Sequence, residues 1–147
     1  MFQHILVVCI GNICRSPVAE AMLRKRLPGK QLSSAGLSAV VDEGVDPKAR
    51  QLAEQAGLEV ASHKARQLTP AMLQAADLVL VMSDGQRRAI ADMSPAMLGK
   101  TMRLGQWLEN GQGKDIPDPY QKSQEVFDYV HRLMDDATRA WASKLGR

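Results

Sequence analysis

The sequence has no long hydrophobic run. Its most apolar stretch near the start, residues 5–10, is far shorter than the roughly 20 residues that a membrane-spanning helix needs. The first residues also lack the basic start and the small-residue cleavage site of a secretory signal peptide. We therefore expect a cytoplasmic protein that does not insert into membranes.

Cysteine is scarce, and neither sign of charge dominates. The chain has two cysteines, Cys9 and Cys14, which argues against a disulfide-stapled secreted fold and favours reduced thiols. The 19 basic and 16 acidic residues give a net charge of +3, and no long run of Lys or Arg is present. We therefore expect no nucleic-acid partner.

Internal repeats, low-complexity tracts and Ser/Gly linkers are absent too. The chain has 147 residues, of which 45% are hydrophobic and 24% are charged. This length and composition suit one ordinary folded domain with a proper core. We expect a monomeric domain that extends over residues 1–147.

Short apolar runs alternate with segments of helical spacing. The runs lie at residues 5–9, 31–35, 77–82 and 101–104. The helical segments carry apolar faces made of Val18, Ala19, Met22 and Leu23, of Leu52, Ala53 and Ala56, and of Val126, Val130, Leu133, Ala137 and Trp141. This alternation predicts a parallel sheet covered on both faces, with residues 79–81 in a central strand and residues 31–35 in an edge strand.

Proline placement predicts where helices begin. Four dipeptides put a capping side chain before a Pro at the first helical position, namely Ser16-Pro17, Asp46-Pro47, Thr69-Pro70 and Ser94-Pro95. The first of them follows closely on the strand that ends near Cys9. In a parallel sheet, ligands bind at this edge, beyond the carboxyl ends of the strands.

The turn between Cys9 and Ser16 has the composition of an anion site. Gly11 and Asn12 are residue types that accept positive φ angles, so the turn can point successive backbone N–H groups into one concave spot. The N-terminus of the following helix adds unpaired N–H groups and a partial positive charge.

A cysteine and an arginine flank this turn. The N–H groups and a hydrogen bond from Ser16 favour a thiolate at Cys9, and the planar guanidinium of Arg15 can hold two oxygens of a tetrahedral oxyanion. A thiolate that faces a bound phosphoryl group is the arrangement for covalent phosphoryl transfer. The spacing of the two residues alone is weak evidence, and the alternative is a structural Cys9 before an ordinary strand–helix turn.

The Pro-rich stretch "KDIPDPYQ", residues 114–121, offers a proton donor for the leaving oxygen of a phosphate ester. Asp115 and Asp118 are both candidates. Tyr120 offers an aromatic wall for a ring-shaped substrate. On the residues alone, Asp118 is equally well interpreted as a fifth helix cap before Pro119.

Together these motifs resemble the low-molecular-weight protein-tyrosine phosphatases. "VCIGNICRSPVAEA" at 8–21, "SSAG" at 33–36, "HKARQL" at 63–68, "ADLVLVM" at 76–82 and "IPDPY" at 116–120 follow the order typical of that family. The resemblance covers nearly the whole chain and is close to the bacterial members that act on tyrosine kinases of capsule and exopolysaccharide export. It implies a three-layer α/β/α fold with a four-stranded parallel sheet and a phosphate-binding loop after the first strand.

The resemblance also implies roles for individual residues. Cys9 is the implied nucleophile, Arg15 binds the phosphoryl oxygens, and Asp118, which precedes Pro-Tyr, is chosen over Asp115 as the proton donor. Asp118 would then act as the base for the water that hydrolyses the cysteinyl-phosphate. No metal or cofactor is implied.

The remaining roles are likewise implied by the resemblance. The phosphate-binding loop includes Ile10, Gly11, Asn12, Ile13, Cys14 and Ser16, and hydrogen bonds of Ser34 and His63 help to shape it. The implied walls for the phosphotyrosine ring are Ile13, Val40 and Tyr120, and the aliphatic "LSAVV" at 37–41 is typical of the bacterial exopolysaccharide branch. Cys14 matches a cysteine that can form a reversible disulfide with the nucleophile. The implied partner is a phosphotyrosine protein, a tyrosine kinase of polysaccharide export.

Three alternatives differ from this prediction. A thioredoxin-coupled arsenate reductase of the same fold would need two further cysteines, which the sequence lacks. A non-enzymatic phosphopeptide-binding module would need neither Asp118 nor a reactive thiol. A zinc site built from His4, Cys9 and Cys14 has no fourth ligand at a suitable spacing.

Overall fold

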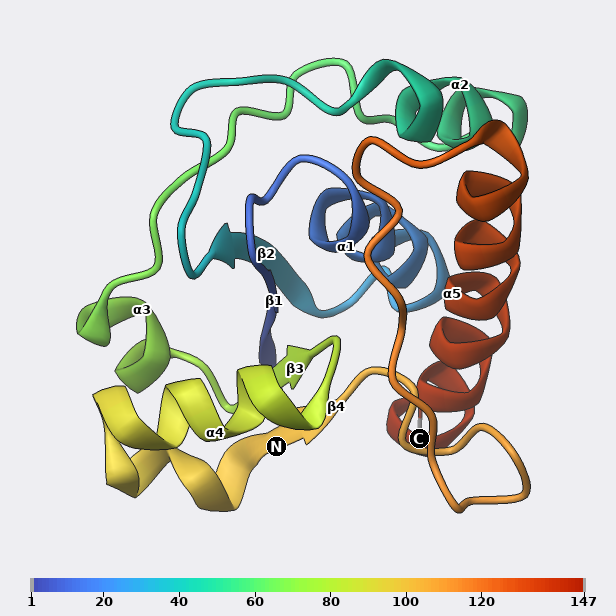
Figure 1. Ribbon diagram of the computed structural model, residues 1–147. Coiled ribbons are helices and arrows are strands. Elements are labelled where there is room, and N and C mark those ends of the chain that lie inside the picture. Colours follow the sequence, from blue (N-terminus) through green and yellow to red (C-terminus); the bar gives the residue numbers. More distant parts are fainter. Residues whose placement is uncertain (1, 147) are drawn as a thin grey trace.

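The computed structural model describes residues 2–146. Its sheet consists of four parallel strands, β1 (His4–Cys9), β2 (Gln31–Gly36), β3 (Leu78–Val81) and β4 (Thr101–Arg103), in the order β2-β1-β3-β4 (Figure 1). The predicted parallel sheet is confirmed, with β3 at a central position and β2 at an edge.

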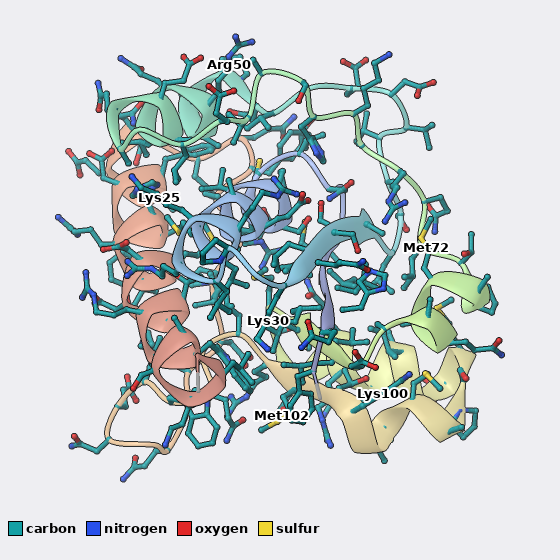
Figure 2. The ribbon with its side chains drawn as sticks, turned by 180° about the vertical axis from the view of Figure 1, so that it is seen from behind. Lys25, Lys30, Arg50, Met72, Lys100 and Met102 are labelled. Carbon is teal, nitrogen blue, oxygen red and sulfur yellow. The ribbon has the colours of Figure 1, made fainter. Side chains whose placement is uncertain are left out.

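Helices lie on both sides of the sheet. On one side are α1 (Arg15–Arg26), α2 (Pro47–Gln55) and α5 (Gln124–Leu145), and on the other are α3 (Pro70–Ala75), α4 (Asp84–Met93) and the 3-10 helix η1 (Pro95–Lys100). The view from behind shows the same separation (Figure 2). The predicted three-layer architecture is therefore confirmed. Within residues 2–146, no helix is long and apolar enough to cross a membrane.

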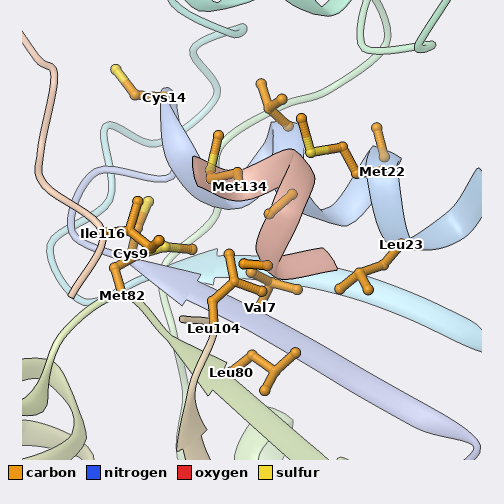
Figure 3. Close-up of a cluster of buried hydrophobic side chains, with 14 of the residues drawn as sticks. Val7, Cys9, Cys14, Met22, Leu23, Leu80, Met82, Leu104, Ile116 and Met134 are labelled. Atoms are coloured by element: carbon orange, nitrogen blue, oxygen red, sulfur yellow. The ribbon is translucent and has the colours of Figure 1, made fainter. Parts of the chain in front are cut away.

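Alternate side chains of the central strands supply two hydrophobic cores. Val7 and Leu80 pack toward α1 and α5 in the core shown in Figure 3, whereas Val8 and Val81 pack toward α3, α4 and η1. This follows from the period of two in a strand, which sends neighbouring side chains to opposite faces. Cys9, at the carboxyl end of β1, thus stands on a platform that is packed from both sides.

Two of the four predicted helix starts are confirmed. The side chains of Asp46 and Thr69 cap α2 and α3 by accepting hydrogen bonds from backbone amides at 3.0 and 3.2 Å. The prediction for Ser16 is wrong, because α1 begins at Arg15 and the Ser16 hydroxyl bonds to Cys9 instead of capping the helix. Ser94 precedes the 3-10 helix η1, and its side chain makes no capping hydrogen bond.

The predicted apolar faces are largely buried, with one exception. Val130, Ala137 and Trp141 of α5 are buried, as is the predicted face of α1. Ala56, in contrast, is exposed, because α2 ends at Gln55 and the chain leaves the helix through Gly57, which has a φ of +75°. Glycine readily adopts this left-handed conformation at the end of a helix.

Candidate active site

The segment between β1 and α1, residues 9–15, lies at the carboxyl edge of the sheet. From β1 the chain turns to β2 on one side, and β3 pairs with β1 on the other side. This is the topological switch point of an open parallel sheet, where ligands of such folds bind. We call residues 9–15 the phosphate loop.

The carbonyl groups of residues 9–13 all accept hydrogen bonds from outside the phosphate loop. The donors are the backbone amides of Leu37, Ser38, Val40 and Asp46 and the Nε2 atom of His63, at 2.7–3.0 Å. In a trans peptide the C=O and the following N–H point in opposite directions. Because the carbonyls point outward, the amides turn to the inside of the loop, and the Asn12 amide donates to Cys9 Sγ at 3.3 Å. The loop therefore forms a concave cradle of N–H groups.

Asn12 fixes the shape of this cradle. It is fully buried and has a φ of +59°, as predicted. Its Nδ2 donates to Ser16 Oγ and Ser34 Oγ at 2.7 and 3.0 Å, and its Oδ1 accepts from the backbone amide of Arg66 at 3.0 Å. Gly11, the other residue type here that accepts a positive φ, does not adopt one, because the single left-handed residue Asn12 is sufficient to turn the chain.

Cys9 lies at the floor of the cradle and is 2% exposed. Its Sγ is 2.9 Å from Ser16 Oγ. Because Ser16 Oγ already accepts a hydrogen bond from Asn12, the hydroxyl hydrogen of Ser16 is free to be donated to the sulfur. Two hydrogen bonds, from the Asn12 amide and the Ser16 hydroxyl, therefore converge on the Cys9 sulfur.

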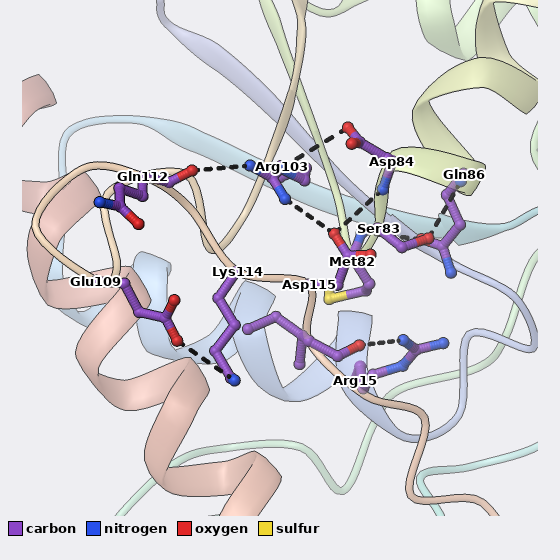
Figure 4. Close-up of polar contacts among 11 residues, drawn as sticks. Arg15, Met82, Ser83, Asp84, Gln86, Arg103, Glu109, Gln112, Lys114 and Asp115 are labelled. Carbon is purple, nitrogen blue, oxygen red and sulfur yellow. Dashed lines mark hydrogen bonds and ion pairs between the residues drawn. The ribbon is translucent and has the colours of Figure 1, made fainter.

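Arg15 extends into the site from the first residue of α1. Its Nη1 donates to the carbonyl of Ile116 at 2.7 Å (Figure 4), and its Nη2 lies 3.7 Å from Asp118 Oδ2. Its Nε is buried and has no hydrogen-bond partner among residues 2–146. A buried, unpaired donor on a charged group is costly, so the guanidinium is arranged for a further acceptor at this place.

The structure separates the two candidate acids. Asp118 faces the cavity above Cys9, and its Oδ1 accepts from the Tyr120 amide at 3.1 Å. Asp115 points away from this cavity and binds Arg103 Nη1 at 3.0 Å (Figure 4). Asp118 is not a helix cap, because the next helix, α5, begins at Gln124 after the N-cap Ser123.

The cavity above Cys9 has a volume of about 160 Å³, and its lining is largely apolar. Ile13, Val40 and Tyr120, predicted as walls, all line it. Val40 and Tyr120 are 43% and 47% exposed, so they are free to cover a flat group that enters the cavity. The other lining residues are Ile10, Gly11, Cys14, Arg15, Ser38 and Asp118 together with Cys9.

Cys14 lies next to the cavity, and both cysteines are free thiols. Burial, followed by the nearby charges of Asp46 and Asp118, raises the pKa of Cys14 to about 12. At neutral pH this thiol therefore stays protonated.

Two residues contribute to the site although the sequence analysis gave them no role. The backbone amide of Arg66 donates to Asn12, and the side-chain Nε of Arg66 donates to the carbonyl of Ser34 at 2.9 Å. Gly36 lets β2 approach the phosphate loop, because a Cβ there would lie 2.5 Å from the Ile10 carbonyl oxygen. Both residues lie in the quoted motifs "HKARQL" and "SSAG", but one sequence carries no sign of what they contact.

The fold and this site together define an α/β enzyme that handles phosphate esters. The family model for "Low molecular weight phosphotyrosine protein phosphatase" matches residues 4–147, and the chain belongs to this family. It is accordingly a low-molecular-weight protein-tyrosine phosphatase. Among residues 2–146, no three His, Cys, Asp or Glu side chains are grouped as in a metal site.

Individual relatives agree with this assignment. The chain is 44% identical to the low molecular weight protein-tyrosine-phosphatase Etp of Escherichia coli K12, over 99% of this chain and 97% of Etp. Vibrio vulnificus Wzb, solved in complex with benzylphosphonate, is 44% identical, with a TM-score of 0.94 over 99% of this chain and all of that chain. The YwlE arginine phosphatase of Geobacillus stearothermophilus is 34% identical, with a TM-score of 0.90 over 97% of this chain and 92% of that chain.

Proposed function

We propose that the protein hydrolyses phosphotyrosine through a cysteinyl-phosphate intermediate. The Cys9 thiolate attacks phosphorus while the bond from phosphorus to the tyrosine oxygen breaks. The Asp118 carboxyl gives its proton to the departing phenolate oxygen, so that tyrosine leaves as a neutral phenol. The products of this step are a phosphorylated Cys9 and an ionised Asp118.

The second step returns the enzyme to its starting state. The ionised Asp118 takes a proton from a water molecule, whose oxygen attacks the phosphorus of the cysteinyl-phosphate. The S–P bond breaks, inorganic phosphate leaves, and Cys9 becomes a thiolate again. Asp118 is then protonated and ready for the next ester, so proton and charge balance over one turnover.

One observation carries this proposal, namely the outward carbonyls of residues 9–13. They leave the loop amides and the Arg15 guanidinium to stabilise charge on the phosphoryl oxygens in the transition state. Donors that are fixed before the reaction need no reorganisation when the charge develops, which is the main advantage of such a site.

The apolar walls support an aryl phosphate as the substrate. Ile13, Val40 and Tyr120 can enclose the faces of a phenyl ring. A phosphorylated guanidinium, the ligand that the name of YwlE indicates for that enzyme, would bring polar N–H groups against these apolar walls, at a cost in hydrogen bonds. We infer that phosphotyrosine is preferred over phosphoarginine.

We propose that the phosphotyrosine protein on which this enzyme acts is a tyrosine kinase of polysaccharide export. We further propose that the enzyme itself is a monomer and acts in the cytoplasm. This proposal is supported by the similarity to the bacterial enzymes Etp and Wzb.

The test is hydrolysis of three phosphorylated compounds by the wild-type protein and by Cys9→Ser, without added metal. We expect the wild type to hydrolyse phosphotyrosine at least tenfold faster, in kcat/KM, than phosphoarginine or phosphoserine, and Cys9→Ser to be inactive. Equal hydrolysis by the two proteins would contradict the role of Cys9. A preference for phosphoarginine would contradict the proposed substrate but not the mechanism.

A further inference from the structure

The loop that carries Asp118 and Tyr120 is held by a basic side chain at each end. At its start, Arg15 binds the carbonyl of Ile116 inside the site. At its end, Lys48 Nζ donates to the carbonyl of Lys122 at 2.9 Å. We call residues 116–122 the acid loop.

The backbone of the acid loop is strained close to the second contact. Gln121 has a φ of +62°, a left-handed conformation that residues with a side chain adopt only at a cost. The Lys122 amide donates back to the Pro119 carbonyl at 2.8 Å, which closes a tight turn. A strained conformation of this kind persists only where its surroundings hold it. Lys48 binds the carbonyl of the residue that directly follows the strained one.

The side chain of Lys48 is itself held in place by the aromatic ring of Phe127. Its ammonium lies 5.6 Å from the centre of the Phe127 ring, and Phe127 is buried in the core. Phe127 and Pro119 both line a small apolar slot behind the acid loop. The exposed Lys48 side chain thus lies over the Phe127 ring and reaches the outer end of the loop.

The first turn of α2 connects this contact to the phosphate loop. The Asp46 amide donates to the carbonyl of Ile13 at 2.8 Å, and the Asp46 side chain caps α2 by accepting from the Lys48 amide at 3.0 Å. Two residues at the start of α2, Asp46 and Lys48, therefore hold the two loops whose relative placement the proton transfer needs. Proton donation requires hydrogen-bond distance between the acid and the leaving oxygen, so this placement matters for catalysis.

We propose that Lys48 is a positioning residue for general acid catalysis. Its ammonium fixes the outer end of the acid loop, so that Asp118 stays above the phosphoryl group held by the phosphate loop. This inference rests on the proposed role of Asp118. It assigns to Lys48 an effect on the step that needs the proton, and none on phosphate binding.

The test compares two substrates that differ in their need for the proton. The leaving group of p-nitrophenyl phosphate is weakly basic and departs with little help, whereas that of phenyl phosphate needs protonation. We expect Lys48→Met to lower kcat/KM about five- to tenfold for phenyl phosphate and less than about twofold for p-nitrophenyl phosphate, the loss of one hydrogen bond from a charged donor. The inhibition constant of inorganic phosphate should stay unchanged, and Lys48→Arg should restore most of the lost activity.

The matched control is Arg50→Met, which removes one positive charge from the same helix. Arg50 pairs with Glu54 at 3.2 Å and points away from the molecule in Figure 2. We expect this variant to hydrolyse both substrates at the wild-type rate. If Lys48→Met does not fold, as judged by circular dichroism, Lys48→Gln gives the same comparison, because its side chain is shorter and ends in a weaker donor.

A second background shows whether Lys48 acts through Asp118. In Asp118→Asn, adding Lys48→Met should change kcat/KM for phenyl phosphate less than about twofold, because the positioned acid is already absent. An equal loss on both substrates, or the full five- to tenfold loss in the Asp118→Asn background, would overturn the proposal for Lys48. A failure of the proposed role of Asp118 as general acid would give a different result, because Asp118→Asn alone would then lower kcat/KM equally for both substrates.

Discussion

Asp118 and Asp115 lie three residues apart in one loop, but their surroundings differ. Asp118 faces the cavity and lies near Arg15, whereas Asp115 is tied to Arg103 and accepts from the Asp84 amide. We predict that Asp118→Asn lowers kcat/KM for phosphotyrosine about a hundredfold to ten-thousandfold, the usual contribution of a general acid. Asp115→Asn should lower it less than about threefold, because an exposed ion pair contributes little. The reverse order in steady-state assays would mean that the acid was wrongly chosen.

The raised pKa of Cys14 predicts how stability changes at alkaline pH. Above pH 9 the Cys14 thiol ionises in the unfolded chain, whereas in the folded chain it keeps its proton up to about pH 12. The folded state then binds more protons than the unfolded state, so its stability falls as the pH rises. Below pH 9 this contribution is fully present.

The measurement is urea denaturation of the wild type and Cys14→Ser at several pH values. Between pH 9 and 11, we expect the free energy of unfolding to fall more steeply in the wild type than in Cys14→Ser, by about 1.4 kcal/mol per pH unit. Parallel curves for the two proteins would show that Cys14 titrates normally in the fold.

For individual residues, backbone conformations and contacts with near neighbours in the sequence were predictable, but hydrogen-bond partners from distant segments were not. The positive φ of Asn12 follows from its residue type, and the contact between Ser16 and Cys9 follows from the spacing of strand and helix. The Arg66 amide that donates to Asn12 lies 54 positions further along the chain, and no local sequence pattern indicates that these two residues pair. The choice between the two acids likewise needed the family resemblance, because Arg103 as a partner of Asp115 cannot be seen from the sequence.

Among the elements, α4 offers a test of the capping contacts. The Ser83 side chain accepts a hydrogen bond from the Gln86 amide at 3.2 Å at the start of this helix, whereas Ser94 at its end makes no capping bond with its side chain. We predict that Ser83→Ala lowers the free energy of unfolding by about 1 kcal/mol, and that Ser94→Ala changes it by less than about 0.5 kcal/mol. Equal effects of the two substitutions in urea denaturation would contradict this account of the helix start.

The elements themselves were the most predictable part of the fold. The predicted runs located all four strands. The central strands β1 and β3 are the clearest, because a strand buried on both faces has no polar alternation to obscure it. Pro dipeptides located α2 and α3, but Ser16-Pro17 misplaced the start of α1. There the serine hydroxyl binds the Cys9 sulfur, so a tertiary contact replaces the local one.

For the whole molecule, the cradle predicts stabilisation by inorganic phosphate. A ligand that binds only the folded state raises the free energy of unfolding by about 2.7 kcal/mol when present at 100 times its dissociation constant. We expect one cooperative thermal transition for residues 1–147, shifted upward by phosphate in the wild type and unshifted in Arg15→Ala at the same concentration. Differential scanning calorimetry measures both, and two separate transitions would contradict a single domain.

The assembly of the site depends on segments that lie far apart in the sequence. The phosphate loop, the segment 37–46, His63 with Arg66, and the acid loop meet at one edge of the sheet. That strands of a parallel sheet bring their carboxyl ends together was predictable from the alternation of strands and helices. Which backbone amides pair with which carbonyls depends on the path of the loops, and the residues alone do not specify it.

The central claim is that Cys9 carries the phosphoryl group during turnover. The most direct measurement is mass spectrometry of protein quenched in acid during steady-state hydrolysis of p-nitrophenyl phosphate, followed by peptide mapping. We predict one phosphoryl group on the peptide that contains Cys9 and Cys14, located on Cys9, and none in Cys9→Ala. Continued turnover by Cys9→Ala, or a phosphoryl group on another residue of the wild type, would contradict the account.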